Sequence, residues 1–231
     1  MNQQKKNYDK ILIRQIERIP EGTVPKLLLH VCCGPCASYV LEWLSAFFEI
    51  HLLYYNPNIA PKGEYDRRLQ TLQALCRQLP MKHPVHFLET DYRPQLFLDS
   101  VRGLEQEPEG GLRCKRCYAM RLEEAARRGK EWGCDYFTTS LTISPMKNPE
   151  IINGMGEAFA EQYGIAYLPG DFKKRGGYQR SIQLCKIYDL YRQRDCGCVY
   201  SRGGGETEDG SVRLLRSGHT SLRSEKEGAG I

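Results

Sequence analysis

Cysteine is the residue type in this sequence with the most reactive chemistry, and its placement along the chain is uneven. The chain has 231 residues and ten cysteines. Seven of the ten form three short groups, which are Cys32, Cys33 and Cys36, then Cys114 and Cys117, then Cys196 and Cys198. Thiolates at such spacings can share a metal ion or an iron-sulfur cluster. Seven thiols exceed what one zinc ion or one four-iron cluster takes, so the spacing indicates two adjacent metal centres.

Two other kinds of site compete with this interpretation. Cys33-Gly34-Pro35-Cys36 has the CxxC spacing of thioredoxin-like proteins, in which a helix N-terminus lowers a thiol pKa. Such a pair would make the protein a thiol-disulfide oxidoreductase, but that activity leaves the second and third groups without a role. A zinc-stabilised nucleic-acid-binding module would use the cysteines for structure alone. Colour and metal content would separate these possibilities.

The remaining cysteines and a nearby histidine suit structural roles. Cys76 lies on the apolar stripe of a predicted helix, Cys185 lies within another helix, and Cys134 begins a predicted strand. A free cysteine packs as a small apolar side chain. His30 ends a leucine-rich strand just before the first group. We expect it to be a hydrogen-bonded structural histidine rather than a metal ligand.

The elements that position the cysteines follow from hydrophobic periodicity. Short apolar runs predict strands at Lys26 to Val31, Ile50 to Tyr55, Val85 to Glu89, Asp135 to Ser140 and Ala166 to Leu168. Amphipathic stretches predict helices at Tyr8 to Ile19, Ala37 to Phe48, Glu64 to Leu79, Lys115 to Trp132, Pro149 to Tyr163 and Tyr178 to Arg192. This alternation is typical of an α/β fold with a mainly parallel sheet. Ligands of such sheets bind beyond the carboxyl ends of the strands, where the cysteine groups fall.

Composition indicates one cytoplasmic domain followed by a tail. Apolar residues make up 41% of the chain and charged residues 26%, as in ordinary globular proteins. No apolar run is long enough to cross a membrane, and the first residues lack the apolar segment of a signal peptide. A reducing cytoplasm disfavours disulfides and so favours metal binding by the cysteines. We expect residues 1–201 to form a single catalytic domain and residues 202–231, rich in glycine, serine and charge, to be a disordered tail.

A basic segment before the last predicted helix is a candidate nucleic-acid contact. The net charge of +5 belongs to residues 1–201, because the tail carries five basic and five acidic residues. The cations of the segment are Lys173, Lys174, Arg175 and Arg180. With two glycines and Tyr178 they suit phosphate contacts and base stacking, and a solvated charged loop is the alternative. Further candidate contacts are Lys62, Arg67 and Arg68 for the backbone and Ser140, Thr142 and Ser144 for the substrate base.

Six ordered motifs run through the chain from about Leu27 to Ser201. They are Leu28-Leu29-His30-Val31-Cys32-Cys33-Gly34-Pro35-Cys36, Tyr55-Asn56-Pro57-Asn58-Ile59, Cys114-Lys115-Arg116-Cys117-Tyr118, Thr138-Thr139-Ser140-Leu141-Thr142-Ile143-Ser144-Pro145, Asp171-Phe172-Lys173-Lys174, and Leu190-Tyr191-Arg192-Gln193 followed by Cys196-Gly197-Cys198. In these motifs the sequence resembles the epoxyqueuosine reductase QueH family. Two positions depart from the family pattern: Gly34 stands where alanine is frequent, and Asp195 where an aromatic residue is frequent. Neither departure removes a thiol.

The resemblance implies a fold, an activity and cofactors. The fold would be similar to the Rossmann-like adenine nucleotide α-hydrolase group. The activity would be the last step of queuosine synthesis, the cobalamin-independent reduction of epoxyqueuosine in tRNA to queuosine, with electrons from an unidentified donor. By motif, Cys33, Cys114, Cys117 and Cys196 would hold a [4Fe-4S] cluster. Cys32, Cys36 and Cys198 would hold an adjacent mononuclear iron, at which the substrate reacts.

The proton donor of such a reaction is left open by the sequence. Tyr118, Tyr191 and Asp195 are candidates because they flank the thiols. Asp195 is also close enough in sequence to approach the metals. An ATP-dependent tRNA thiolase of related fold is disfavoured, because the SGGxDS phosphate loop expected after the first strand is replaced by the cysteine motif.

Overall fold

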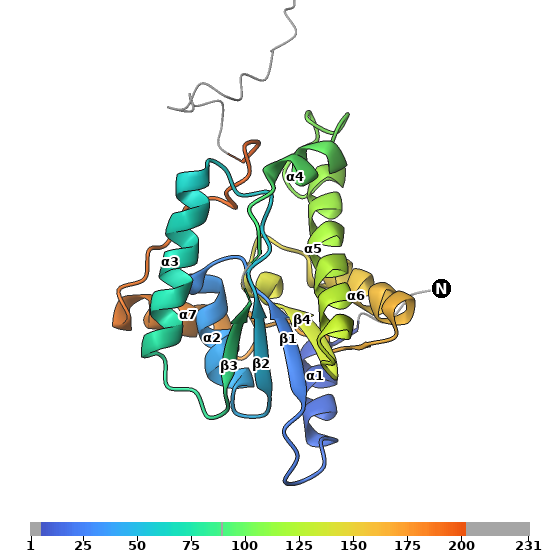
Figure 1. The fold of residues 1–231 in the computed structure, drawn as a ribbon, viewed down its shortest axis with the longest axis vertical. Helices are drawn as coiled ribbons and strands as arrows, with labels where there is room; N and C mark the ends of the chain where they lie inside the picture. The colour runs from blue at the N-terminus through green and yellow to red at the C-terminus, as the bar shows by residue number, and fades with distance from the viewer. Residues whose placement is uncertain (1–5, 89, 202–231) are drawn as a thin grey trace, which may run out of the picture.

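A single parallel sheet forms the centre of the protein. The computed structural model describes residues 6–88 and 90–201. Its strands are β1 (Lys26–His30), β2 (Glu49–Leu53), β3 (Val85–Leu88), β4 (Tyr136–Thr139) and β5 (Ala166–Tyr167). They lie in the order β3-β2-β1-β4-β5, and every neighbouring pair is parallel (Figure 1). The predicted α/β fold with a parallel sheet is therefore confirmed.

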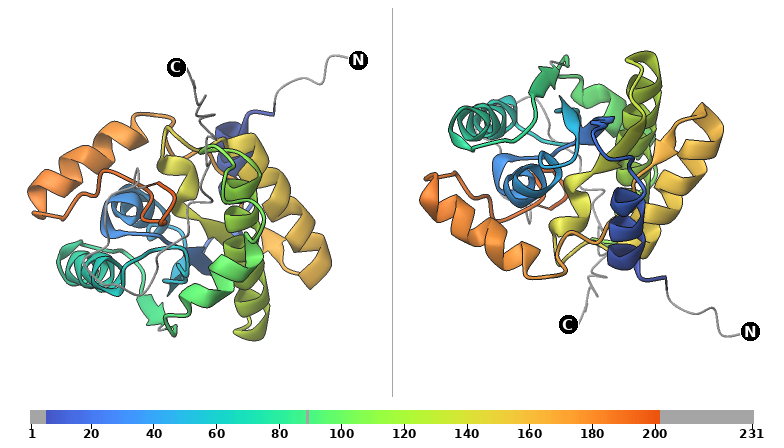
Figure 2. Two further views of the ribbon diagram at one scale, coloured as in Figure 1. Left: turned by 90° about the horizontal axis from the view of Figure 1, so that it is seen from above. Right: turned by 90° about the horizontal axis from the view of Figure 1, so that it is seen from below.

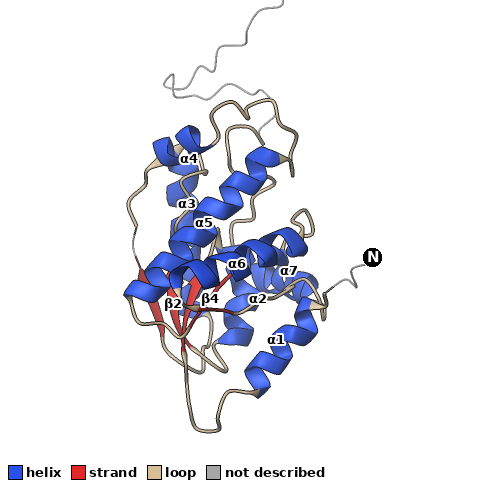
Figure 3. Ribbon diagram, turned by 90° about the vertical axis from the view of Figure 1, so that its right-hand side faces the viewer, coloured by secondary structure: helices blue, strands red, loops and turns tan. Residues whose placement is uncertain are grey.

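Helices cover both faces of the sheet. On one face lie α2 (Gly34–Leu44), α3 (Lys62–Gln78) and α7 (Gly177–Ile187), and on the other lie α5 (Leu112–Glu131) and α6 (Pro149–Tyr163) (Figures 1 and 2). The remaining helices are α1 (Tyr8–Glu17), the short α4 (Pro94–Ser100) and the 3-10 turn η1 (Ser140–Ile143). Figure 3 shows the molecule from the side of α5 and α6, with these helices in front of the strands. None of the described helices is long and apolar enough to span a membrane.

The leucine run of β1 explains why the sheet is buried on both faces. Leu27 and Leu29 point into the core shared with α2 and α3, whereas Leu28 points into the core shared with α5 and α6. All three are fully buried. Parallel strands with a helix layer on each side require such continuous apolar runs.

The order of the strands places a crevice above β1 and β4. From β1 the chain proceeds through β2 to β3 on one side, and from β4 it proceeds to β5 on the other. Connections that leave two neighbouring strands in opposite directions leave an opening at their carboxyl ends. The first cysteine group follows β1 and η1 follows β4, so both segments border this opening.

Several helix ends differ from the sequence prediction, and two of these differences affect the segments that carry cysteines. Helix α2 begins at Gly34 rather than Ala37, because Cys33 caps it by accepting a hydrogen bond from the Cys36 amide. Helix α7 ends at Ile187 instead of Arg192, and Asp189 then adopts a left-handed conformation with a φ of 47°. The chain consequently reaches the third cysteine group as an irregular segment. The predicted tail lies outside the described residues.

Candidate metal and substrate site

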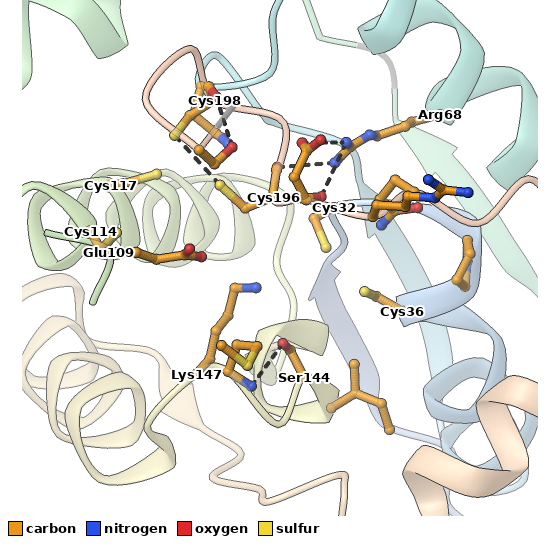
Figure 4. Close-up of a pocket in the computed structure, with 18 of the residues that line it drawn as sticks. Cys32, Cys36, Arg68, Glu109, Cys114, Cys117, Ser144, Lys147, Cys196 and Cys198 are labelled. Carbon is orange, nitrogen blue, oxygen red and sulfur yellow. Dashed lines mark hydrogen bonds and ion pairs between the residues drawn. The ribbon is translucent and has the colours of Figure 1, made fainter. Parts of the chain in front are cut away.

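A cavity of about 440 Å³ lies at the carboxyl ends of β1 and β4. Six of the seven predicted ligand thiols line it, namely those of Cys32, Cys36, Cys114, Cys117, Cys196 and Cys198 (Figure 4). They come from the segment after β1, from the start of α5 and from the segment after α7. The fold thus brings together three cysteine groups that are far apart in the sequence.

The first group is shaped by the start of α2. The Sγ atoms of Cys32, Cys33 and Cys36 lie within 4.8 Å of one another. Cys33 is fully buried, and its sulfur accepts hydrogen bonds from the Cys36 amide at 3.4 Å and from the Gln193 side chain at 2.8 Å. A Cβ atom on Gly34 would lie only 3.0 Å from a side-chain carbon of α3, so glycine allows the two helices to approach closely here.

The second group occupies the first two turns of α5. Cys114 and Cys117 are three residues apart, which puts both sulfurs on one side of the helix. The buried guanidinium of Arg113 donates to the backbone carbonyl of Glu105 at 2.9 Å and so fixes the loop that enters the helix. One turn after Cys117, the buried Arg121 donates to the Cys117 carbonyl at 3.1 Å. Both arginines thereby stabilise the backbone that carries the thiols.

The third group is held by Arg68, and here the sequence prediction was wrong. Arg68 is expected from sequence to contact tRNA, but it is only 1% exposed. Its guanidinium forms an ion pair with Glu64 at 2.7 Å and donates to the Cys196 carbonyl at 3.0 Å. Gly197 has a φ of 91°, and a Cβ there would lie 2.9 Å from the same guanidinium. Glycine therefore lets the segment turn tightly, with the Cys196 and Cys198 sulfurs 3.5 Å apart.

Hydrogen bonds among the thiols concentrate negative charge on two of them. The thiols of Cys33 and Cys36 lower the pKa of Cys32. The Cys198 thiol lowers the pKa of Cys196 to about 5, whereas burial raises the pKa of Cys33 to about 12. The thiolate is the form that binds a metal. The first and third groups therefore each offer one readily ionised sulfur to the cavity.

The histidine and the other cysteines take the structural roles expected from sequence. Both ring nitrogens of the fully buried His30 are engaged, one with the Thr139 hydroxyl at 2.8 Å and one with the Tyr55 carbonyl at 3.1 Å. Burial lowers the pKa of His30 to about 3, so the ring is neutral. Cys76 and Cys134 pack in the two cores. Cys185 is also buried in the core, but it lines the cavity as well.

The predicted tRNA-binding cations mostly form ion pairs within the protein. The pairs are Lys173 with Asp171 at 2.6 Å, Arg175 with Asp9 at 3.1 Å, and Arg180 with Glu42 at 2.6 Å. Lys174 is exposed, and none of the four lines the cavity. Tyr178, from the same segment, does line it. This geometry leaves Lys174 as the most available phosphate contact of the set.

Sequence reasoning missed several residues that line the cavity. Lys147 enters it from the turn after η1, and Arg192 and Arg194 enter it from the segment before the third cysteine group. The signal for Lys147 was its place shortly after a predicted strand that ends at the cysteine-bearing edge. Arg192 was hidden because the predicted last helix extended to it.

Comparisons with known proteins agree with this site. The family model described as epoxyqueuosine reductase QueH matches residues 27–203. A protein of that name from Streptococcus pyogenes serotype M1 is 46% identical over 202 residues, covering 86% of this chain and 79% of the relative. Another, from Thermotoga maritima, is 32% identical over 183 residues, covering 78% of this chain and 90% of the relative. The chain belongs to the epoxyqueuosine reductase QueH family.

Proposed function

We propose that this protein reduces the epoxide of epoxyqueuosine in tRNA to the alkene of queuosine. Six thiols from three chain segments converge on one cavity, and this observation carries the proposal. Removing the oxygen of an epoxide consumes two electrons and two protons and releases water. Thiol side chains do not supply low-potential electrons by themselves, so the reaction requires a redox group that such a set of sulfurs can hold.

The donor atoms at the cavity fit iron-sulfur chemistry. All seven candidate ligands are cysteines, and sulfur ligands suit a [4Fe-4S] cluster. We propose that Cys33, Cys114, Cys117 and Cys196 hold the cluster, and that Cys32, Cys36 and Cys198 hold a mononuclear iron. The assignment of these seven cysteines as ligands has more support than their division between the two centres. The Cys33 sulfur, assigned to the cluster, lies within 4.8 Å of the Cys32 and Cys36 sulfurs, which are assigned to the iron. When bound, these groups would relay single electrons and act as a Lewis acid.

The side chains around the thiols suit a nucleic-acid substrate. Tyr178, Arg192 and Arg194 line the cavity together with the cysteines. An aromatic ring can stack on a base that is turned out of an RNA loop, and arginine can contact the flanking phosphates. We propose that the anticodon nucleotide enters here in the cytoplasm, where tRNA resides. The reducing electrons come from a low-potential donor protein or small molecule.

A thiol-disulfide exchange activity has little support from the geometry. The nucleophilic cysteine of such an enzyme is accessible and has a lowered pKa. Cys33, the first residue of the CxxC pair, is fully buried, and burial raises the pKa of its thiol to about 12. The zinc-stabilised binding module remains a second outcome that metal analysis can identify.

Anaerobic reconstitution with iron and sulfide tests the proposal. The reconstituted protein should be brown, and with a low-potential reductant it should convert epoxyqueuosine tRNA to queuosine tRNA, measured by mass spectrometry of the nucleosides. Protein incubated with zinc alone is the control and should be colourless and inactive. A protein that binds only zinc under both conditions, and never converts the substrate, would contradict the proposed function.

A further inference from the structure

Lys147 extends its ammonium group into the cavity, toward the thiols of the first and third groups (Figure 4). It belongs to a tight turn after η1, in which the Lys147 amide donates to the Ser144 carbonyl at 3.2 Å and the Met146 amide donates to the Ser144 hydroxyl at 3.3 Å. The side chain is partly buried. The turn at the end of β4 therefore aims one cation at the place where the substrate would react.

Most other cations of the cavity are already engaged. Arg68 pairs with Glu64, Arg113 and Arg121 donate to the carbonyls of Glu105 and Cys117, and Arg192 donates to the Tyr178 hydroxyl at 3.0 Å. Arg194 is exposed. Across residues 6–88 and 90–201, no hydrogen bond or ion pair holds the Lys147 ammonium. A partly buried charge without a partner is costly, so this arrangement suits a ligand that supplies one.

The electrostatic reach of Lys147 extends across the cavity. The pKa of Cys32 is lowered mainly by hydrogen bonds from neighbouring thiols, and that of Cys196 mainly by the Cys198 thiol. The positive charge of Lys147 lowers both further. These two cysteines belong to groups on distant parts of the chain, and the Lys147 ammonium points toward both of them in the cavity (Figure 4).

We propose that Lys147 is the catalytic acid that protonates the epoxide oxygen. The inference deepens the proposed function and rests on it. As the first C–O bond breaks, the proton moves from Nζ to the oxygen. The second C–O bond breaks with a second proton from solvent, so the oxygen leaves as water while two electrons from the low-potential reductant complete the C=C bond. The neutral amine then regains its proton from water.

The donors suggested by sequence are less suitable than Lys147. The Tyr191 hydroxyl donates to the Glu64 carboxylate at 3.0 Å, and the Asp195 carboxylate accepts from the Gly197 amide at 2.7 Å. Tyr118 is buried, at 8% exposure, and is therefore less accessible to a substrate than the partly exposed Lys147. Lys147 instead combines a place in the cavity with an ammonium that no hydrogen bond or ion pair among the described residues holds.

The test uses iron-reconstituted full-length protein and single-turnover kinetics at saturating epoxyqueuosine tRNA. Lys147→Ala should lower the rate about 10²- to 10⁴-fold, as expected for loss of a general acid. Lys147→Arg should stay equally slow, because a guanidinium keeps the charge but hardly releases its proton. Added methylamine should partly restore the rate of Lys147→Ala. Iron content, the electron paramagnetic resonance spectrum and the Kd for tRNA should stay within about two-fold of wild type.

Two control variants separate chemistry from binding. Lys82→Ala removes an exposed lysine that does not line the cavity and should change nothing. Tyr118→Phe removes the competing hydroxyl beside the thiols, and a loss of rate as large as that of Lys147→Ala would assign the proton to Tyr118 instead. Full recovery by Lys147→Arg, or a loss confined to Kd, would show that Lys147 only attracts tRNA, and an unchanged rate in Lys147→Ala would also overturn the proposal. If Lys147→Ala loses iron, Lys147→Gln provides the same comparison. A wild-type protein without turnover refutes the proposed function instead.

Discussion

At the scale of single residues, Arg68 connects α3 to the segment that carries Cys196 and Cys198. Its removal would delete the ion pair with the Glu64 carboxylate, whose side chain is 10% exposed. We expect Arg68→Ala to lower the free energy of unfolding by about 3–5 kcal/mol, the usual cost of breaking a buried pair. Bound iron should fall as well, because the third cysteine group loses its anchor. Urea unfolding and iron analysis check both.

The neighbouring arginine is the matched control for that change. Arg67 is exposed and lies over the Tyr191 ring at 3.5 Å. An exposed cation–π contact of this kind contributes about 0.5–1 kcal/mol. Arg67→Ala should therefore cost no more than that and should leave the iron content unchanged. Equal effects of the two substitutions would mean that burial of Arg68 has no energetic consequence.

Cysteine substitutions distinguish ligands from core residues. Cys114→Ala and Cys117→Ala should lose cluster absorption and activity, because each removes a proposed cluster ligand. Cys36→Ala should keep the colour but lose the separate iron and the activity. Cys76→Ala should keep iron and activity at a cost of about 1–2 kcal/mol of stability, as for a small, partly buried side chain packed against the core. It is a cleaner control than Cys185→Ala, since Cys185 lines the cavity. Absorbance, iron content and turnover together decide the assignment.

Residue spacing predicted the thiols of the site but not the residues that hold the cysteine-bearing segments in place. Short intervals between cysteines are visible in any sequence, and six of the seven thiols line one cavity. Arg68, by contrast, contacts the Cys196 carbonyl 128 residues away. The residues next to an arginine in the sequence do not reveal whether so distant a partner buries it or whether it lies on a solvent-exposed helix face. Only the folded arrangement distinguishes the two.

At the scale of elements, α6 packs against β5 through Gly156. A Cβ on Gly156 would lie 2.3 Å from a ring atom of the buried Tyr167. Gly156→Ala should destabilise the protein by about 1–3 kcal/mol, because the ring must shift in a filled core. Gly154, two residues earlier in the same helix, has nothing within 4 Å of such a Cβ. Gly154→Ala should instead stabilise it by about 0.5–1 kcal/mol. Thermal unfolding of the two variants measures both the expected loss and the expected gain of stability.

The basic segment before α7 makes a prediction about tRNA binding. Lys174 is exposed, whereas Arg180 is paired with Glu42. Lys174→Glu should weaken tRNA binding and reduce the slope of log K against log salt by about 1, with unchanged iron content. Arg180→Glu should chiefly lower stability, because it places a second carboxylate beside Glu42. An unchanged salt slope in Lys174→Glu would mean that this segment is only a solvated surface.

Element predictions succeeded where a periodic pattern was long and failed where local geometry decided. The five strands and the six long helices follow from runs and stripes of apolar residues. The seven residues of α4 and the four of η1 are too short to show a period. The end of α7 depends on the left-handed conformation of Asp189, a residue type for which that conformation is only one of several options.

At the scale of the whole molecule, the described chain ends in contacts close to the site. The Ser201 hydroxyl donates to the Cys198 carbonyl at 2.8 Å. We expect a chain that ends at Ser201 to bind iron, convert substrate and melt like the full protein, because the composition of residues 202–231 disfavours burial. Iron content, turnover and Tm of the shortened protein are the measurements. A large fall in any of them would assign a role to the last residues.

The thiols come from three separate segments of the chain, so a metal bound by them would connect those segments. Residues 188–201 contain no helix or strand, and they carry ligands that would share metals with residues 32–36 near the start of the chain. Iron would therefore act as a cross-link between distant parts of the chain, as a disulfide does in secreted proteins. Removing it should free this segment. Trypsin should then cleave after the exposed Arg192 or Arg194 in metal-free protein and spare the reconstituted form.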